Sequence, residues 1–213
     1  MTRSSSRPVD PSRTAHAVLL AAAIGVAAPA ASAGEHDHHQ HQQQAQANRS
    51  VSRTTANYKV PDAPMVRMDG TKVKFGADID DARPVVLNFI YTTCTAICPV
   101  MTQTFAEVQT KLGSERDTVR MVSVSIDPEQ DTPARLREYA KQYKAGPQWQ
   151  FYTGTVESSI AVQKAFDAYR GDKMNHTPVT FLRPGPGKPW IRLDGFATPD
   201  EIVREVRQLA AAK

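Results

Sequence analysis

The stretch Tyr91–Thr92–Thr93–Cys94–Thr95–Ala96–Ile97–Cys98–Pro99 contains both cysteines of this 213-residue chain. The run Val-Val-Leu-Asn-Phe-Ile at residues 85–90 precedes it and predicts a buried strand. Apolar residues at helical spacing follow it and predict a helix over about 99–112. The two sulfurs are therefore expected where a buried strand turns into a helix, which is where open α/β sheets form their sites.

The remaining periodic segments alternate strands with helices. Asp69–Gly70 lies between two short apolar runs and predicts a β-hairpin. Further strands are expected at 119–126, 149–152, 178–182 and 190–193, and further helices after Thr132–Pro133, over 156–169 and after Thr198–Pro199. With a thiol pair after the first central strand, this order predicts a thioredoxin-like α/β sandwich. Its central mixed sheet is flanked by helices and has an N-terminal β-hairpin.

The charge balance excludes one class of partner. The chain has 26 Lys and Arg against 22 Asp and Glu, a formal charge of +4. This excess is small and is not clustered, and no basic-and-aromatic pattern forms a stacking platform, so nucleic acid is not expected as a partner. Two cysteines alone do not make a disulfide framework, which favours a functional role for the pair.

The N-terminal residues 1–33 have the pattern of a signal peptide. Arg3, Arg7 and Arg13 precede an apolar run at 17–28, and Ala31–Ser32–Ala33 supplies the small residues that precede a cleavage site. Proline 29 interrupts the run before the roughly 20 residues that a membrane span needs, although a retained anchor stays open as the alternative. Export would place the two thiols in an oxidising compartment.

Residues 34–57 form a polar segment rich in His and Gln, which we expect to be a disordered tail ahead of a folded domain at 58–213. Four of its residues, His36, His38, His39 and His41, can capture a soft or borderline metal ion. A solvated linker explains the same composition.

Cys94 and Cys98 are spaced to act together. Four residues apart on a helix, their side chains share one face and are close enough to bridge or to chelate one ion. A helix amino terminus favours the thiolate, which is both a redox nucleophile and a soft-metal ligand. The spacing therefore leaves redox and metal-binding functions open, beside the plainer interpretation of two buried core cysteines.

His176 is the only histidine within 58–213, and it precedes the strand expected at Pro178. In a thioredoxin-like fold the loop before that strand packs against the Cys loop, which predicts His176 as a third ligand. Two thiolates and one imidazole suit Cu(I), and with a further ligand or a water they can hold Cu(II). A hydrogen-bonded loop histidine is the plainer alternative. Met174 and Met101 are candidate soft auxiliary ligands, with core filling the better account of Met101.

Three blocks of the sequence resemble the Sco/SenC family of copper chaperones: residues 87–101 with the Cys-x-x-x-Cys-Pro motif, residues 123–133, and His176–Thr177. The resemblance covers roughly residues 58–210. It implies that Cys94, Cys98 and His176 bind one copper ion, as Cu(I) or Cu(II), and that the cysteines cycle between dithiol and disulfide.

The same resemblance implies a function and a location. The chain is expected to deliver copper to the binuclear copper site of cytochrome c oxidase subunit II, or to maintain the thiols of that site. Its further partners would be a periplasmic copper donor and a thiol reductant. It would act in the periplasm, attached to the inner membrane if the signal is uncleaved.

Two residues depart from the family pattern. Asn175 stands where the family commonly has Asp, which removes a charge that could orient the imidazole. Pro178 occupies the place of the cis-proline of thioredoxin-type reductases and favours thiol–disulfide work. The alternative function is therefore an exported thiol–disulfide reductase that uses Cys94 and Cys98, and whether the chain is an enzyme stays open.

Overall fold

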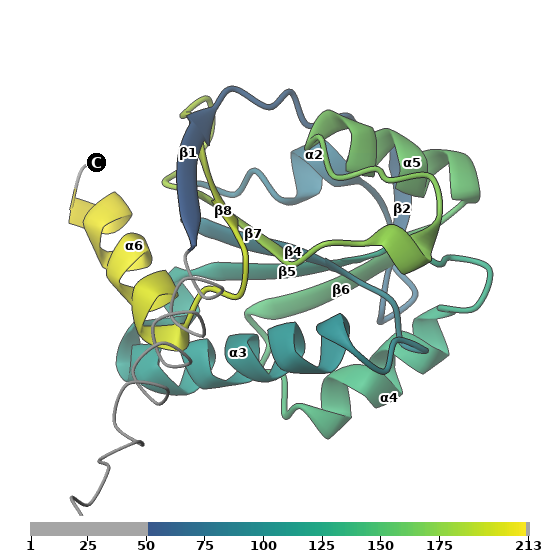
Figure 1. The fold of residues 1–213 in the computed structure, drawn as a ribbon, viewed down its shortest axis with the longest axis horizontal. Coiled ribbons are helices and arrows are strands. Elements are labelled where there is room, and N and C mark those ends of the chain that lie inside the picture. Colours follow the sequence, from purple (N-terminus) through teal and green to yellow (C-terminus); the bar gives the residue numbers. More distant parts are fainter. Residues whose placement is uncertain (1–50, 212–213) are drawn as a thin grey trace, which may run out of the picture. The chain divides into compact units, whose positions relative to one another are not determined.

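The computed structural model describes residues 51–211, which form one sheet of eight strands covered by helices on both faces (Figure 1). The strands lie in the order β1-β8-β7-β4-β5-β6-β2-β3. The pairs β4–β5 and β5–β6 are parallel, and the others are antiparallel, so the sheet is mixed as predicted. The strands are β1 (Ser52–Ala56), β2 (Pro64–Arg67), β3 (Lys72–Lys74), β4 (Val85–Ile90), β5 (Arg120–Ser125), β6 (Trp149–Gly154), β7 (Val179–Arg183) and β8 (Trp190–Asp194).

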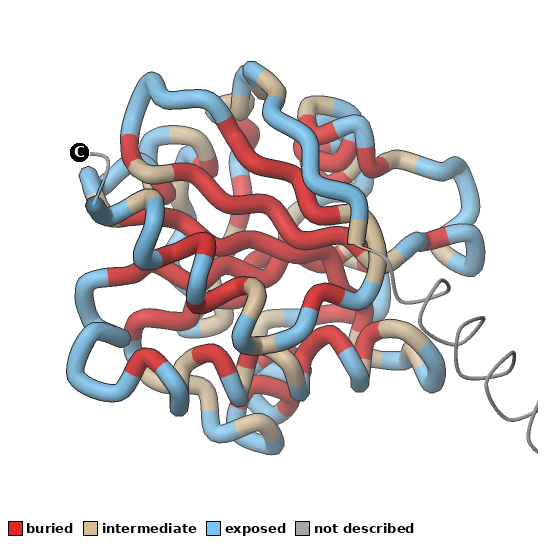
Figure 2. Tube along the Cα trace, turned by 60° about the vertical axis from the view of Figure 1, so that its left-hand side comes forward, coloured by how far each residue is buried: buried red, intermediate tan, exposed pale blue. Residues whose placement is uncertain are grey.

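The helices form two layers. Helices α3, α4 and α6 cover one face, and α2 and α5 cover the other (Figure 1). Each layer buries its own apolar cluster against the sheet, and Figure 2 shows the buried strands running through the centre of the domain. The helices are α2 (Phe75–Asp78), α3 (Ile97–Leu112), α4 (Pro133–Gln142), α5 (Val156–Ala165) and α6 (Pro199–Ala211), with 3₁₀ turns η1 (Gly113–Thr118) and η2 (Lys173–Asn175).

Strand β4 is the central element that leads into the Cys loop. All six of its residues are buried. Val86 and Ile90 pack into one cluster, and Leu87 and Phe89 into the other, because successive side chains of a strand point to opposite faces. A strand covered on both faces reads as a nearly continuous apolar run, which is why the sequence pattern located it.

The predicted caps are confirmed. The Thr132 hydroxyl accepts the backbone N–H of Arg135 at the start of α4. At the start of α6, Thr198 donates its N–H to Glu201 and accepts the Glu201 N–H in return, which completes a capping box. The hairpin at Asp69–Gly70 forms between β2 and β3. These local signals satisfy backbone groups that a helix end or a tight turn would otherwise leave unpaired.

Two helix boundaries differ from the prediction. Helix α3 begins at Ile97, so Cys98 lies inside its first turn rather than just before it. Helix α5 ends at Ala165 instead of near Tyr169, because Asp167 adopts a positive φ of 50° and turns the chain away. The loop that follows α5 is therefore longer than expected, and it leads to His176.

The boundary between tail and domain is corrected by strand β1. Residues 52–56, which the sequence analysis assigned to the tail at 34–57, pair with β8 along the edge of the sheet. Four of the five β1 residues are exposed, so no apolar pattern marked the strand. The predicted signal peptide at 1–33 and most of the tail lie outside the described residues. Within 51–211, no helix is long and apolar enough to cross a bilayer.

Candidate metal centre

Cys94 and Cys98 lie together at the carboxyl end of β4, as the sequence predicted. Cys94 is half-buried in the loop, and Cys98 is fully buried in the first turn of α3. Both are free thiols, and the Cys98 backbone N–H donates to Cys94 Sγ at 3.3 Å. The start of the helix therefore points a donor at one of the two sulfurs, as expected for a thiolate site.

The two thiols differ in acidity. Burial works against the Cys94 thiolate, but the N–H groups of Cys98 and Ala96 outweigh it, and the net effect lowers the pKa of Cys94. Burial raises the pKa of Cys98 well above its usual value. Cys94 is thus the more accessible and more acidic thiol. Cys98 stays protonated until a metal ion or another sulfur atom takes the place of its proton.

A buried carboxylate fixes the loop that carries the cysteines. Asp131 is fully buried and accepts the Thr92 N–H at 3.2 Å and the Thr92 hydroxyl at 2.5 Å. It also accepts the Ser125 hydroxyl at 2.6 Å. These hydrogen bonds join the Cys loop to the chain that follows β5.

His176 lies directly before β7 and is 7% exposed. Neither of its ring nitrogens has a hydrogen-bond partner among residues 51–211. Burial lowers the pKa of His176 to about 4, so the ring is neutral near pH 7. Buried polar atoms in native proteins are almost always paired, so an unpaired neutral imidazole is the group that a metal ion would satisfy.

Tyr91 connects the two loops of the site. Its hydroxyl donates to Met174 Sδ at 3.6 Å, and Lys173 Nζ lies 5.6 Å from the centre of its ring. Lys173 also forms an ion pair of 2.6 Å with Asp127. The segment that ends in His176 is therefore held against the end of β4. Met174 is 73% exposed beside this contact, whereas Met101 is buried, which confirms core filling for Met101.

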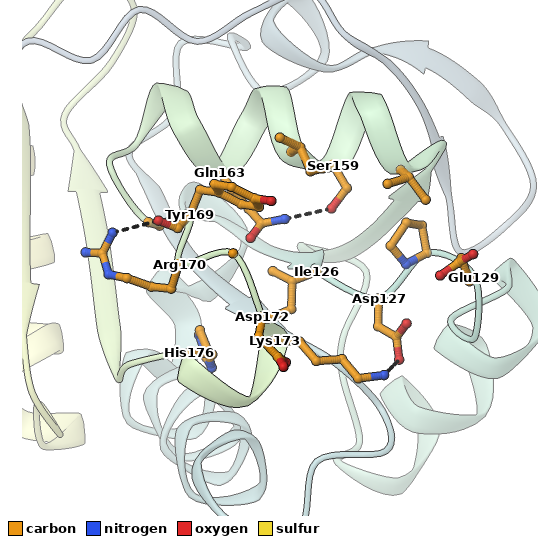
Figure 3. Close-up of a pocket in the computed structure, with 15 residues that line it drawn as sticks. Ile126, Asp127, Glu129, Ser159, Gln163, Tyr169, Arg170, Asp172, Lys173 and His176 are labelled. Carbon is orange, nitrogen blue, oxygen red and sulfur yellow. Dashed lines mark hydrogen bonds and ion pairs between the residues drawn. The ribbon is translucent and has the colours of Figure 1, made fainter.

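A cavity of about 280 Å³ adjoins His176. It opens between α5, the loop after β5 and the segment 168–176, with Asp127 and Lys173 on one side (Figure 3). Ser159 and Gln163 of α5 contribute polar side chains to its lining. The residue His176 therefore borders a recess that lies beside α5.

The structure does not preassemble the three predicted ligands. Within residues 51–211, no three side chains of Cys, His, Asp or Glu are close enough together to hold a metal ion. Cys94 and Cys98 are brought together, and His176 lies in the neighbouring loop without completing the set. The donor types fit a soft or borderline metal, since two thiols and a neutral imidazole are available and the imidazole has no other partner.

The two departures from the family pattern have structural outcomes. No peptide bond within 51–211 is cis, so the bond before Pro178 is trans, as most X-Pro bonds are. Pro178 differs in this respect from the cis-proline of thioredoxin-type reductases, and the redox alternative rests on the two free thiols. Asn175 does not hydrogen-bond the His176 ring within the described residues, in agreement with the loss of an orienting group.

The sequence analysis missed two contributors to the site. It gave no role to Asp131, although this residue lies in the second block of the family resemblance, and none to the hydroxyl of Tyr91. Both act through contacts between loops that are far apart in the chain. The only sequence signal for either residue was its position in one of the blocks that resemble the family.

The fold and site define a thioredoxin-like protein with a Cys-x-x-x-Cys pair at a strand–helix junction and a histidine in the opposing loop. The family model of SCO1/SenC matches residues 63–211. The SCO1 protein homolog of Bacillus subtilis is 31% identical over 167 residues, which are 74% of this chain and 86% of that protein. The chain belongs to the SCO1/SenC family.

Solved structures agree with this assignment. BsSco, a member of the Sco family of cytochrome c oxidase assembly proteins in which a disulfide switch was identified, is 32% identical, with a TM-score of 0.63 over 75% of this chain and 98% of that one. ScoI of Bradyrhizobium japonicum with copper bound has a TM-score of 0.61 at 22% identity, over 72% of this chain and 99% of that one. The latter likeness shows the shared fold.

Proposed function

We propose that this protein handles copper for the assembly of cytochrome c oxidase, and that Cys94, Cys98 and His176 hold one copper ion as cargo. Membership of the SCO1/SenC family supports this, as do relatives whose names state copper binding or oxidase assembly. The observation that carries the ligand assignment is the buried His176 ring, whose two nitrogens have no partner among the described residues.

The three ligands would play different parts. Cys94, with its lowered pKa and partial exposure, is the sulfur that meets the incoming ion first. Cys98 then loses its proton to solvent as the metal takes its place, which makes the affinity depend on pH. His176 is already neutral, so it would bind the ion without first releasing a proton, and a movement of its loop toward the thiols would supply the third donor. The three ligands would thus come together only when copper binds.

The cellular setting follows from the same proposal. The receiving site is the binuclear copper site of cytochrome c oxidase subunit II, and the chain works in the periplasm after export, loaded by a periplasmic copper donor and kept reduced by a periplasmic thiol reductant. The leader pattern at 1–33 supports export, and retention of that segment would leave the domain attached to the inner membrane.

A second candidate function is favoured by the difference in acidity between the thiols. In a reductase, the Cys94 thiolate attacks one sulfur of a target disulfide, forms a mixed disulfide and releases the other target sulfur as a thiolate. Cys98 then loses its proton and attacks Cys94 Sγ, which releases the second target thiolate. Two electrons pass from the protein dithiol to the target, and a Cys94–Cys98 disulfide remains for an external thiol reductant.

Copper titration of the anaerobically reduced protein tests the first function. We expect one ion at the thiol site, with the visible absorption of a thiolate–Cu(II) complex, and weaker binding in His176→Ala. Asn175→Ala is the matched control, since it changes an exposed neighbour in the same loop. Unchanged affinity and absorption in His176→Ala would rule out the three-ligand site. Reduction of a subunit II disulfide by a protein that binds no copper would instead support the second function.

A further inference from the structure

Met174 is an exposed methionine beside the thiols. The other methionines of the described chain belong to the interior: Met65, Met101 and Met121 are buried, and Met68 packs against an apolar cluster. Met174 is the most exposed of the large apolar side chains between residues 51 and 211. Core filling therefore does not account for its place in the fold, although a single exposed apolar side chain is common in itself.

The sulfur of Met174 is turned toward Tyr91. The Tyr91 hydroxyl donates to Met174 Sδ at 3.6 Å. Tyr91 is buried at the end of β4, where it packs in the same cluster as Cys98, so its hydroxyl is a fixed point. The Met174 sulfur thus has a defined position over the Cys loop, even though most of the side chain faces solvent.

Tyr91 also places Cys94. The Cys94 backbone N–H donates to the Tyr91 carbonyl at 3.2 Å, which folds the start of the Cys loop back onto the tyrosine. The Cys94 side chain reaches the hydroxyl as well, because burial first and this neighbour second raise the pKa of Tyr91 to about 12. One hydroxyl therefore lies beside the sulfurs of both Cys94 and Met174.

The turn that carries Met174 is held in place and leads to His176. Asp172 accepts the Met174 N–H at 2.8 Å at the start of η2, and the His176 N–H donates to the Lys173 carbonyl at 3.1 Å at its end. The ion pair of Lys173 with Asp127 anchors the same turn (Figure 3). An ion bound to the Met174 sulfur would thus lie next to the loop that carries the imidazole.

Burial limits which ligands can exchange copper with another molecule. Cys98 is fully buried and His176 is 7% exposed, so neither can meet a copper donor or acceptor at the surface. Cys94 is half-buried and is a single sulfur. A thioether is a soft, neutral ligand that takes Cu(I) without releasing a proton, and Met174 presents one at the surface beside Cys94.

We propose that Met174 is an exchange ligand for copper: Met174 Sδ and Cys94 Sγ bind the incoming Cu(I) first, and Cys98 and His176 then displace the thioether. This inference rests on the proposed function and names one further residue of it. No electron is transferred. The ion stays Cu(I), the two thiols release their protons to solvent as they bind it, and Met174 returns to Tyr91 unchanged. The loaded site then has two sulfurs and one imidazole, and unloading runs through the same steps in reverse.

Selenomethionine labelling tests the first of these steps. The labelled, reduced protein carries Cys98→Ser and His176→Ala, so that the ion cannot move on, and Gln at the four tail histidines. With less than one equivalent of Cu(I), X-ray absorption at the copper edge should show one selenium and one sulfur neighbour. Adding Met174→Leu should remove the selenium, whereas Met101→Leu, the matched control at a buried methionine, should keep it. Bound copper without a selenium neighbour, or no bound copper, overturns the exchange ligand.

The rate of copper release tests the role of Met174 in the otherwise unaltered protein. The reduced protein is loaded with one equivalent of Cu(I) and mixed with a small-molecule Cu(I) chelator. Met174→Leu should lose the ion about tenfold more slowly than the wild type. Its equilibrium affinity should stay within about twofold, because the loaded site does not include the thioether. Leucine keeps the size and the apolar character of the side chain, so a role in packing or in docking a protein partner would not change the rate.

The outcomes separate this inference from the proposed function. Equal release rates in the two proteins overturn the exchange ligand and leave copper binding by Cys94, Cys98 and His176 standing. A large loss of affinity in Met174→Leu also overturns it, since Met174 would then be a permanent ligand. A wild-type protein that takes up no Cu(I) at its thiols overturns the proposed function, and the exchange ligand with it.

Discussion

Thr92 donates both its backbone N–H and its hydroxyl to the buried carboxylate of Asp131, across 39 residues of sequence. The same carboxylate accepts the hydroxyl of Ser125 at the end of β5. This contact fixes the start of the Cys loop to the sheet two residues before Cys94. Among the described residues, the hydrogen bonds of Asp131 go to Thr92 and Ser125 and not to either sulfur. Asp131 nevertheless sets the position of the thiols, because it holds the loop that carries them.

Asp131→Asn should loosen the Cys loop. The amide has one acceptor oxygen in place of two and turns an N–H₂ toward donors, which leaves a buried polar group unpaired and costs about 1–3 kcal/mol. We expect the free energy of unfolding in urea to fall by that amount and copper affinity to fall with it. Asp117→Asn, at an exposed carboxylate, is the control. If Asp131→Asn were as stable to urea as the wild type, the hydrogen bonds of Asp131 would not be what holds the Cys loop.

The stability of the metal-free protein should depend on pH through His176. The folded-state pKa is about 4, and the unfolded value is about 6.5, so the unfolded state binds more protons between these values. Stability is fully present above pH 6.5 and is lost as the pH falls toward 4, by about 3 kcal/mol at most. The loss occurs because protonation favours the unfolded chain.

Urea unfolding of the wild type and of His176→Phe at several pH values isolates this contribution. Carboxylates titrate in the same range in both proteins, so the difference between the two curves reports the histidine. We expect the variant to lose less stability between pH 6.5 and 4. Parallel curves would mean that His176 is not buried as a neutral ring.

Alkylation should distinguish the two thiols. Cys94 is partly exposed with a lowered pKa, and Cys98 is buried with a raised one. At pH 7 we expect iodoacetamide to modify Cys94 at least tenfold faster in the reduced, metal-free protein, because only thiolates react. Mass spectrometry of Cys98→Ser and Cys94→Ser measures each thiol alone. Faster modification of Cys98 would contradict the assignment of Cys94 as the first ligand and nucleophile.

Strands and helices could be predicted from the sequence where an apolar pattern or a capping residue marks them. Strand β4 is apolar throughout, and Thr132 and Thr198 mark their helices through their own hydrogen bonds. Strand β1 escaped prediction because its side chains face solvent and its pairing is made by backbone groups. An edge strand of this kind has no periodic signal of its own.

The site was predictable in its residue types but not in its geometry. The spacing of Cys94 and Cys98 and the position of His176 before β7 followed from the sequence. The unequal acidity of the thiols and the unpaired state of the histidine depend on burial and on which N–H points at which sulfur. Such contacts between distant loops are set by tertiary packing, which no local pattern records.

X-ray absorption at the copper edge tests the central claim most directly. The protein should be reduced, loaded with one equivalent of Cu(I), and carry the Gln substitutions at His36, His38, His39 and His41, so that only the thiol site contributes. The account predicts two sulfur neighbours and one imidazole nitrogen, with the imidazole contribution absent in His176→Ala. A sulfur-only environment that is the same in both proteins would contradict it.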